Sequence, residues 1–316
     1  MIVSMLMLIL GFAILLLGAD RLVKGAASLA KQLNVPQIVI GLTIVALGTS
    51  TPELIVNIVA ALKGSPDLSY GNIIGSNTFN VFIILGISAM IYPLNIRKAT
   101  FLKEIPFALL ASIVMLIMVN DHWFDAGAAN LLSRGDGFIL LGLFGLFLIY
   151  AHSLSKQGSE AQPHIKTYPL AACIGFILVG LGGLVLGGNW VVKYALVIAR
   201  EMGISEKIIG LTIVAAGTSL PELATSAVAA YKKHSDIAIG NIIGSNIFNL
   251  LFVMGVTSII EPPLYSLSFN TDQYAMILSI ALLFIFILIP RRHRLERWQG
   301  GMLIAVYIAY AVFLLK

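Results

Sequence analysis

The chain has 316 residues, of which 59% are hydrophobic and only 11% are charged, and its mean hydropathy is +0.96. Soluble domains carry about 25% charged residues, so this composition excludes a soluble enzyme or binding module and indicates a polytopic membrane protein. The formal net charge of +5 does not indicate a nucleic-acid partner, because the basic residues lie in short segments between apolar stretches. The single cysteine, Cys173, excludes an intramolecular disulfide.

Ten apolar stretches are long enough to cross a bilayer, which takes about 20 residues. In chain order they are 2–28, 36–62, 69–93, 101–119, 136–154, 169–198, 207–231, 238–261, 273–290 and 299–315. The first and the sixth are long and carry polar residues such as Asp20 and Asn189 toward one end, so we expect these two helices to lie tilted across the bundle. The polar segment Ser155–Tyr168 predicts a connector between two halves, 1–154 and 169–316.

The two halves repeat each other at a constant offset of 169 residues. Gly41–Leu54 reads GLTIVALGTSTPEL and Gly210–Leu223 reads GLTIVAAGTSLPEL, so 12 of 14 positions match. Further along, Gly71–Asn80 reads GNIIGSNTFN and Gly240–Asn249 reads GNIIGSNIFN. Because five spans per repeat is an odd number, the second copy enters the membrane from the opposite side. This predicts an inverted repeat, which is the geometry of alternating-access transporters.

The distribution of basic residues predicts the orientation of the chain. With the N-terminus outside, 14 basic residues fall on the cytoplasmic side and 5 on the external side, and Lys193 is left unassigned within its span. Cytoplasmic loops of membrane proteins carry an excess of Lys and Arg. We therefore expect both termini to be external and the connector Ser155–Tyr168 to be cytoplasmic.

The first repeated motif places Gly-Thr-Ser-x-Pro-Glu inside an apolar stretch. Proline lacks a backbone donor and glycine permits non-helical dihedrals, so we expect each span to break near mid-membrane. Broken backbone in a bilayer is tolerated only where it lines a cavity or is buried in protein. The carbonyls expected to be freed there, as candidate cation ligands, are those around Ala46–Leu47 and Ala215–Ala216, and the hydroxyls that add further oxygens belong to Thr49, Ser50, Thr218 and Ser219.

Glu53 and Glu222 complete this motif. A carboxylate in lipid is energetically expensive, so its default interpretation is functional. The structural alternative is that Pro and Gly only kink a packed helix and that each Glu caps a half-helix. Duplication of the whole motif favours the functional interpretation.

The second repeated motif lies on the next predicted helix of each half. Ser76 and Asn80 follow Asn72 at intervals of four residues, so the three share one helix face, and Asn241, Ser245 and Asn249 repeat the pattern. We expect Asn80 and Asn249 to lie beside the carboxylates. Two alternatives stay open for Asn72 and Asn241, and also for Asn77 and Asn246: they bind the ion, or they only form hydrogen bonds between helices.

These groups together form an all-oxygen site without cysteine or histidine. Calcium takes 6–8 oxygen ligands, so two carboxylates with amide, hydroxyl and carbonyl oxygens suit it better than magnesium, zinc or copper. Sodium can use the same neutral oxygens. One calcium ion or several sodium ions can neutralise the two carboxylates, and such competition is how an antiporter couples its substrates. We expect no prosthetic group, only transported Ca²⁺ and Na⁺.

The paired motifs resemble the alpha repeats of the sodium/calcium exchanger family, within the cation/calcium antiporter superfamily, and the resemblance covers nearly the whole chain. The short connector makes the chain similar to the prokaryotic branch. The resemblance implies an all-α polytopic membrane protein, with ten transmembrane helices as two inverted five-helix repeats and broken helices at the ion site, in a prokaryotic inner membrane. It implies the central ligands Glu53, Asn80, Glu222 and Asn249, and the sodium-coordinating positions Ala46, Thr49, Ser50, Ser76, Ala215, Thr218, Ser219 and Ser245.

The chain departs from the family pattern at two points. Ser155–Tyr168 is far too short to be the large cytosolic calcium-sensing loop of animal exchangers. Asn also stands at both 80 and 249, where some members carry Asp, so this site has only two formal charges and potassium co-transport is not expected.

Sodium/calcium antiport is therefore the expected function. A proton/calcium antiporter is the first alternative, because two adjacent carboxylates can exchange protons. A passive cation channel is an alternative of another class, and it would show flux without a counter-ion. An intramembrane enzyme that uses Glu53 and Glu222 as acid and base lacks a nucleophile or a histidine set. The sequence does not predict the oligomeric state.

Overall fold

The structure is a computed structural model, and it describes residues 2–125, 129–156, 166–202, 215–289 and 293–314. Helices dominate these ranges, with two short strands, β1 (Leu94–Asn95) and β2 (Arg294–Leu295), which pair antiparallel. Most of the predicted connector, residues 157–165, lies outside the described residues.

The first half consists of helices that follow the predicted spans. In chain order they are α1 (Ile2–Gln32), α2 (Gln37–Ile40), η1 (Gly41–Val45), α3 (Ala46–Thr49), α4 (Thr51–Leu62), α5 (Pro66–Phe79), η2 (Asn80–Leu85), α6 (Gly86–Ile91), η3 (Thr100–Glu104), α7 (Ile105–Met118), η4 (Asp121–Trp123) and α8 (Arg134–Ser155). Three of the short elements, η1, η2 and η3, are π-helical, and η4 is a 3₁₀ turn.

The second half follows the same order. Its described helices are α9 (Leu170–Glu201), α11 (Ala215–Gly217), α12 (Leu220–Tyr231), α13 (Ser235–Ile247), η6 (Phe248–Val253), α14 (Met254–Ile260), η7 (Leu267–Phe269), α15 (Asn270–Leu288) and α16 (Arg297–Leu314). The π-helical element η6 follows α13 as η2 follows α5, so the repeat extends to irregular details of the helices.

The described residues contain eight helices that are long and apolar enough to cross a membrane. Two consecutive segments, Gln37–Thr49 and Thr51–Leu62, make a ninth span that bends by 45°. The bend confirms the predicted break in the first repeat. The predicted count of ten is not confirmed, because the seventh predicted span, 207–231, lies partly outside the described residues.

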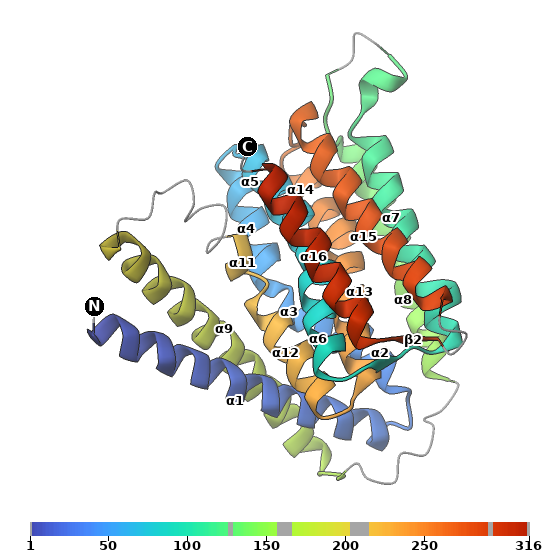
Figure 1. Cartoon of the computed structure of the whole chain (residues 1–316). Coiled ribbons are helices and arrows are strands. Elements are labelled where there is room, and N and C mark those ends of the chain that lie inside the picture. Colours follow the sequence, from blue (N-terminus) through green and yellow to red (C-terminus); the bar gives the residue numbers. More distant parts are fainter. Residues whose placement is uncertain (1, 126–128, 157–165, 203–214, 290–292, 315–316) are drawn as a thin grey trace.

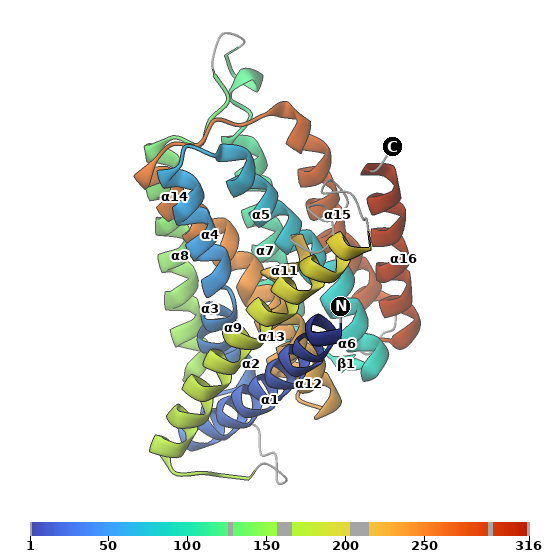
Figure 2. The same ribbon diagram turned by 90° about the vertical axis from the view of Figure 1, so that its left-hand side faces the viewer.

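Two long helices, α1 and α9, lie side by side and cross the rest of the bundle obliquely (Figure 1), as the view turned by 90° also shows (Figure 2). A Cβ atom added at Gly18 would lie 2.8 Å from the Leu184 nitrogen, and one added at Gly187 would lie 2.5 Å from the Leu15 nitrogen. The two helices therefore approach each other through glycines. Gly18 and Gly187 are equivalent at the offset of 169 and each packs on the other helix, as a twofold relation between antiparallel repeats requires.

The second motif forms the centre of the bundle. The continuous helices Pro66–Ile91 and Ser235–Ile260 are the most buried of the membrane-spanning candidates. A Cβ atom added at Gly244 would lie 2.6 Å from the Leu42 carbonyl oxygen, so this glycine lets α13 touch the backbone of η1. Small residues at helix contacts are typical of membrane bundles.

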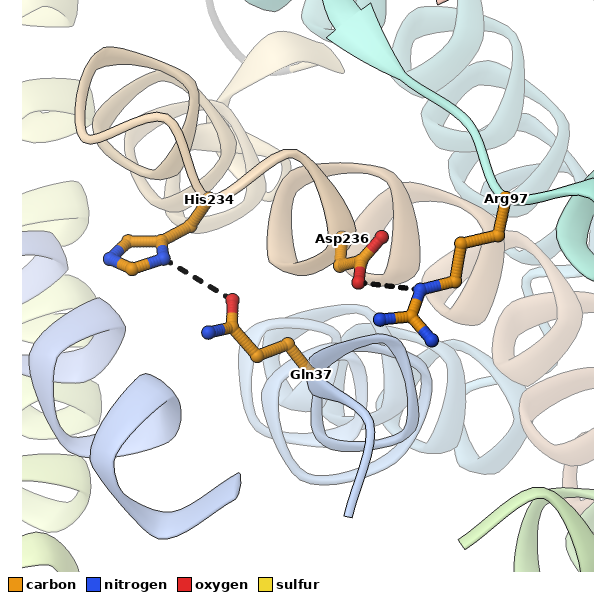
Figure 3. A network of polar contacts seen from close by, with 4 residues as sticks. All are labelled: Gln37, Arg97, His234 and Asp236. Atoms are coloured by element: carbon orange, nitrogen blue, oxygen red, sulfur yellow. Dashed lines mark hydrogen bonds and ion pairs between the residues drawn. The ribbon is translucent and has the colours of Figure 1, made fainter. Parts of the chain in front are cut away.

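One end of the bundle carries Arg97, Lys232 and Lys233, and we call it the basic end. The Lys232 ammonium lies 2.5 Å from Asp20 of α1, which ties the α12–α13 turn to α1. Figure 3 shows two further contacts of this turn and the start of α13: the His234 Nδ1–H donates to Gln37 Oε1 at 3.2 Å, and the Arg97 guanidinium pairs with Asp236 at 2.7 Å. Burial, together with the nearby Lys232 charge, lowers the pKa of His234, so its ring is neutral at pH 7.

Candidate functional site

Each of the two predicted helix breaks is centred on a serine. Ser50 lies between α3 and α4 with φ −84° and ψ 8°, and Ser219 lies between α11 and α12 with φ −86° and ψ 5°. Both Glu53 and Glu222 then lie in the first turn of a half-helix, where the positive end of the helix dipole favours a carboxylate. Both glutamates are fully buried.

Each carboxylate is held by a serine of the opposite repeat. The Ser50 hydroxyl donates to Glu222 Oε1 at 2.9 Å, and the Ser219 hydroxyl donates to Glu53 Oε1 at 3.4 Å. Ser245 also donates to Glu222 Oε1, at 3.5 Å. The two breaks therefore meet, and they place both carboxylates in one buried cluster.

The predicted threonines also bond across the repeats. Thr49 Oγ1 donates to Asn241 Oδ1 at 2.9 Å, and Thr218 Oγ1 donates to Asn72 Oδ1 at 3.3 Å. Asn72 and Asn241 therefore hydrogen-bond between helices, which is one of the two alternatives left open by the sequence. The threonine oxygens keep their lone pairs, so they can still face a cation.

Two partners of these asparagines were not singled out from the sequence. Asn72 Nδ2 donates to Asn57 Oδ1 at 2.7 Å, and Asn241 Nδ2 donates to Ser226 Oγ at 3.0 Å. Asn57 and Ser226 are equivalent at the offset of 169, and both are fully buried. The constant offset, applied to every buried polar position, could have identified them.

Five buried side-chain oxygens of the predicted ion ligands have no hydrogen-bond partner among the described residues. They are Glu53 Oε2, Ser76 Oγ, Asn80 Oδ1, Glu222 Oε2 and Asn249 Oδ1. Buried polar atoms nearly always find a partner, and an unpaired one costs about 1–3 kcal/mol. All five can act as electron-pair donors, so each of these predicted ligands has an oxygen available for a cation.

Asn80 and Asn249 lie where the helices widen into π-helical turns. Asn80 is the first residue of η2, and Asn249 is the second residue of η6. Such turns are rare and often occur at functional sites. The sequence pattern of four-residue spacing gave no sign of them.

The prediction that the carbonyls around Ala46–Leu47 are free of hydrogen bonds is wrong. The Ala46 carbonyl accepts the Ser50 N–H at 2.9 Å, and the Leu47 carbonyl accepts the Thr51 hydroxyl at 3.0 Å. The helix continues through these residues and breaks only at Ser50. The carbonyl without its usual helical donor is that of Gly48, because Pro52 has no backbone N–H. The Thr49 hydroxyl also lies 3.3 Å from the Ala46 carbonyl oxygen, so this oxygen faces two donors. Ala215 begins α11, but its side chain lies outside what the structure describes.

A cavity of about 600 Å³ runs along α9 from its middle to its last turn. Residues of both helix breaks and of α9 line it, among them Thr51, Pro52, Asn189, Lys193, Thr218 and Pro221. The equivalent of α9 in the first repeat is α1. It packs along α12, and its Asp20 forms an ion pair with Lys232. The cavity therefore borders the candidate site at Thr218 beside α9, whereas the equivalent helix α1 packs along α12.

Neutral oxygens make up most of this site. Within the described ranges, no group of three or more His, Cys, Asp or Glu side chains is arranged to hold a metal ion. Two carboxylates with neighbouring amide and hydroxyl oxygens make a donor set that suits hard cations such as calcium and sodium.

The family model described as sodium/calcium exchanger protein matches residues 3–152 and 172–316. The chain is 35% identical to the putative antiporter CaxA of Alkalimonas amylolytica, over 99% of both chains. It is 29% identical to the sodium/calcium exchanger MaX1 of Methanosarcina acetivorans, over 99% of this chain and 98% of that one.

Other similar proteins extend the comparison to a bacterial membrane protein and to solved structures. The chain is 34% identical to the inner membrane protein YrbG of Escherichia coli strain K12, over 99% of this chain and 97% of that one. Among solved structures it resembles the sodium-calcium exchanger NCX_Mj soaked with zero Na⁺ and Ca²⁺, with a TM-score of 0.83 and 32% identity over 99% of both chains.

Proposed function

Because the chain belongs to the sodium/calcium exchanger protein family, we propose that it exchanges Na⁺ for Ca²⁺ across the membrane at the cluster around Glu53 and Glu222. The observation that carries this proposal is the set of unpartnered buried oxygens, which includes one oxygen of each carboxylate. A bound cation would give each of these oxygens the electrostatic partner that it lacks. The family consists of cation exchangers, so the proposal specifies the ions and their ligands.

Calcium takes its binding energy from the two carboxylates. Glu53 and Glu222 replace the hydration of a divalent cation, and Asn80 and Asn249 add neutral amide oxygens. Sodium relies on the hydroxyls of Thr49, Ser50, Thr218, Ser219, Ser76 and Ser245 and on the carbonyls of Ala46 and Ala215. The cross-repeat bonds of Ser50 and Ser219 support a single shared site, because both carboxylates must then respond to either ion.

Alternating access follows from the inverted repeat. The cavity along α9 supports an ion path from one side of the membrane, and the α1–α12 packing supports a closed path on the other. If α1 opens from α12 while α9 closes over its cavity, the ion site becomes accessible from the other side of the membrane. The positive-inside bias supports a cytoplasmic basic end and external termini, and the functional halves are 1–154 and 169–316. The likeness to an Escherichia coli inner membrane protein supports the inner membrane as the location.

A proton/calcium antiporter is the second candidate. The observation that favours it is the meeting of two fully buried carboxylates, which can take up protons in place of sodium. The many hydroxyls around the carboxylates favour sodium, because a monovalent cation needs neutral oxygens and a proton does not.

Calcium uptake into proteoliposomes tests the proposal. Sodium, potassium and proton gradients are imposed in turn, and uptake is expected only with an outward sodium gradient. Uptake at full rate with a proton gradient and no sodium would replace sodium by protons as the counter-ion. Calcium flux with no counter-ion at all would indicate a channel and contradict exchange.

A further inference from the structure

Four buried asparagines form a closed hydrogen-bonded cluster where the two repeats meet. Asn77 Nδ2 donates to the Asn246 backbone carbonyl at 3.3 Å, and Asn246 Nδ2 donates to the Asn77 backbone carbonyl at 3.3 Å. Asn80 Nδ2 donates to Asn246 Oδ1 at 3.0 Å, and Asn249 Nδ2 donates to Asn77 Oδ1 at 3.0 Å. Asn77 and Asn246 are equivalent at the offset of 169, so this pair lies on the pseudo-twofold relation of the repeats.

The chemistry of this cluster leaves only one orientation for each amide. A backbone carbonyl can only accept, so Asn77 and Asn246 must present their NH₂ groups to each other's backbone. Their side-chain oxygens then face Asn249 and Asn80, and an oxygen can only accept there. Asn249 and Asn80 must therefore also present NH₂ groups, and their own oxygens point elsewhere.

The oxygens left over are two of the unpartnered atoms of the site, Asn80 Oδ1 and Asn249 Oδ1. A free asparagine could turn its amide by about 180° and place an NH₂ group toward a cation, which repels it. We infer that Asn77 and Asn246 are positioning residues that hold Asn249 and Asn80 with their oxygens directed to the transported ion. This role rests on the proposed function, because it presumes that Asn80 and Asn249 are ion ligands.

Removal of the anchoring amide tests the role. Asn246→Ala or Asn77→Ala is expected to raise the KM for calcium in sodium-driven uptake by roughly 10- to 100-fold, as loss of groups that orient metal ligands does. The maximal rate at saturating calcium is expected to change less. Asn246→Asp keeps an oxygen that accepts from Asn80 but loses the N–H that donates to the Asn77 carbonyl, so it is expected to restore only part of the calcium affinity that the alanine variant loses.

The matched control is another reciprocal asparagine pair, for which the described residues show no hydrogen bond to a candidate ion ligand. Asn120 and Asn270 exchange side-chain hydrogen bonds at 3.1 and 2.9 Å, where the segment after α7 meets the start of α15. Asn120→Ala removes comparable bonds and is expected to lower thermal stability without a change in the KM for calcium. Where an alanine variant at Asn77 or Asn246 does not fold, the serine variant, which leaves a smaller cavity, takes its place with the same expected result.

A double-mutant comparison separates positioning from general destabilisation. Calcium binding to purified protein is measured for Asn246→Ala, for Asn80→Ala and for the double variant. If Asn246 acts through Asn80, Asn246→Ala has little further effect once Asn80 is alanine, whereas independent effects multiply. A wild-type KM for calcium in both Asn77→Ala and Asn246→Ala would overturn the inference. Effects of Asn246→Ala and Asn80→Ala on calcium binding that multiply fully in the double variant would also overturn it. Absence of sodium-driven uptake by the wild-type protein would instead refute the proposed function.

Discussion

At the scale of single residues, the site is built from reciprocal contacts between repeats. Ser50 holds Glu222 and Ser219 holds Glu53, so neither repeat completes its own half of the site. A change to one carboxylate therefore affects the whole ion site. Because calcium requires both negative charges to replace its hydration, the loss of one charge is expected to abolish binding rather than halve it.

Glu53→Gln or Glu222→Gln is expected to abolish calcium exchange, while the protein still inserts into the membrane. Glutamine keeps the size of the side chain and removes only the charge. The measurement is sodium-driven calcium uptake into proteoliposomes, normalised to the amount of inserted protein. Near-normal uptake by either variant would exclude the proposed site.

The matched control for these variants is Glu104→Gln. Glu104 is also a buried carboxylate of a membrane-spanning helix, and it accepts a hydrogen bond from Tyr150 outside the ion site. Its glutamine variant is expected to keep most of the uptake. This result would show that charge matters at Glu53 and Glu222 because of the ion.

Thr49→Ala or Thr218→Ala is expected to weaken the response to sodium while calcium binding stays detectable. Calcium gains most of its binding energy from the carboxylates, whereas sodium depends on neutral oxygens. The KM for sodium is expected to rise roughly tenfold, within the range seen for lost groups around a metal site. Thr49→Ser and Thr218→Ser keep the hydroxyl that donates to Asn241 or Asn72, so they are the controls. An equal loss of calcium and sodium affinity would contradict this division of roles.

The identities of the candidate ligands could be predicted from the sequence, but most of their partners could not. Duplication marks Glu53 and Glu222 because both copies retain a costly residue. The bond from Ser50 to Glu222 rather than to its own repeat depends on how the halves pack, which no local pattern encodes. The prediction for the Ala46 carbonyl failed because the N–H that Pro52 lacks would have donated to the Gly48 carbonyl, four residues earlier, so the Ala46 carbonyl keeps its hydrogen bond from Ser50.

At the scale of elements, the two equivalent long helices sit in different surroundings. Asp20 of α1 pairs with Lys232 and closes the basic end, whereas its equivalent Asn189 on α9 lines the cavity. The equivalent of Lys232 is Lys63, which cannot form an ion pair with an asparagine. The asymmetry of the sequence at this pair matches the asymmetry of the helix packing.

Asp20→Asn is expected to loosen α1 from α12 and to expose the site from the basic end. The probe is Thr225→Cys, because Thr225 is the buried equivalent of Val56, which lines the cavity on the other side. Both ion-pair side chains are partly exposed, so the pair contributes at most about 1 kcal/mol and labelling should accelerate roughly two- to fivefold.

The control for this experiment breaks another ion pair at the same end. Glu296→Gln disrupts the contact of Arg294 and Glu296 at 3.5 Å without touching α1. It is expected to leave the labelling of Thr225→Cys unchanged, and Cys173 is replaced by alanine in all variants. Unchanged labelling in Asp20→Asn would show that helix packing alone closes the basic end.

At the scale of the whole molecule, the inverted repeat predicts that equivalent positions face opposite sides of the membrane. Lys63 follows the last residue of α4, and its equivalent Lys232 follows the last residue of α12. Lys232 is in an ion pair with Asp20, so its exposed neighbour Lys233 serves as the probe on that side, and Lys63 is exposed as well. With Cys173 replaced, Lys63→Cys is expected to react with an impermeant thiol reagent from outside, and Lys233→Cys from the cytoplasm. Labelling of both from the same side would refute the inversion, and reversed labelling would refute the orientation from the basic residues.

The overall architecture follows from long-range features of the sequence. Hydropathy predicted the spans, and the offset of 169 predicted the pairing of α1 with α9 and of α5 with α13 as equivalents. The π-helical turns at Asn80 and Asn249 were not predicted, because a single inserted residue per turn leaves no mark on apolar composition. The position of the cavity beside α9 rather than beside α1 was not predicted either. The two repeats carry nearly identical motifs, so their sequences allow a cavity beside either helix.

The central claim is that one set of oxygens binds either calcium or sodium. Equilibrium calcium binding to the purified protein tests it most directly, at increasing sodium concentration with choline keeping the ionic strength constant. The apparent Kd for calcium is expected to rise with sodium, and more steeply than in proportion if several sodium ions replace one calcium ion. A calcium Kd that does not respond to sodium but responds to pH would contradict the claim.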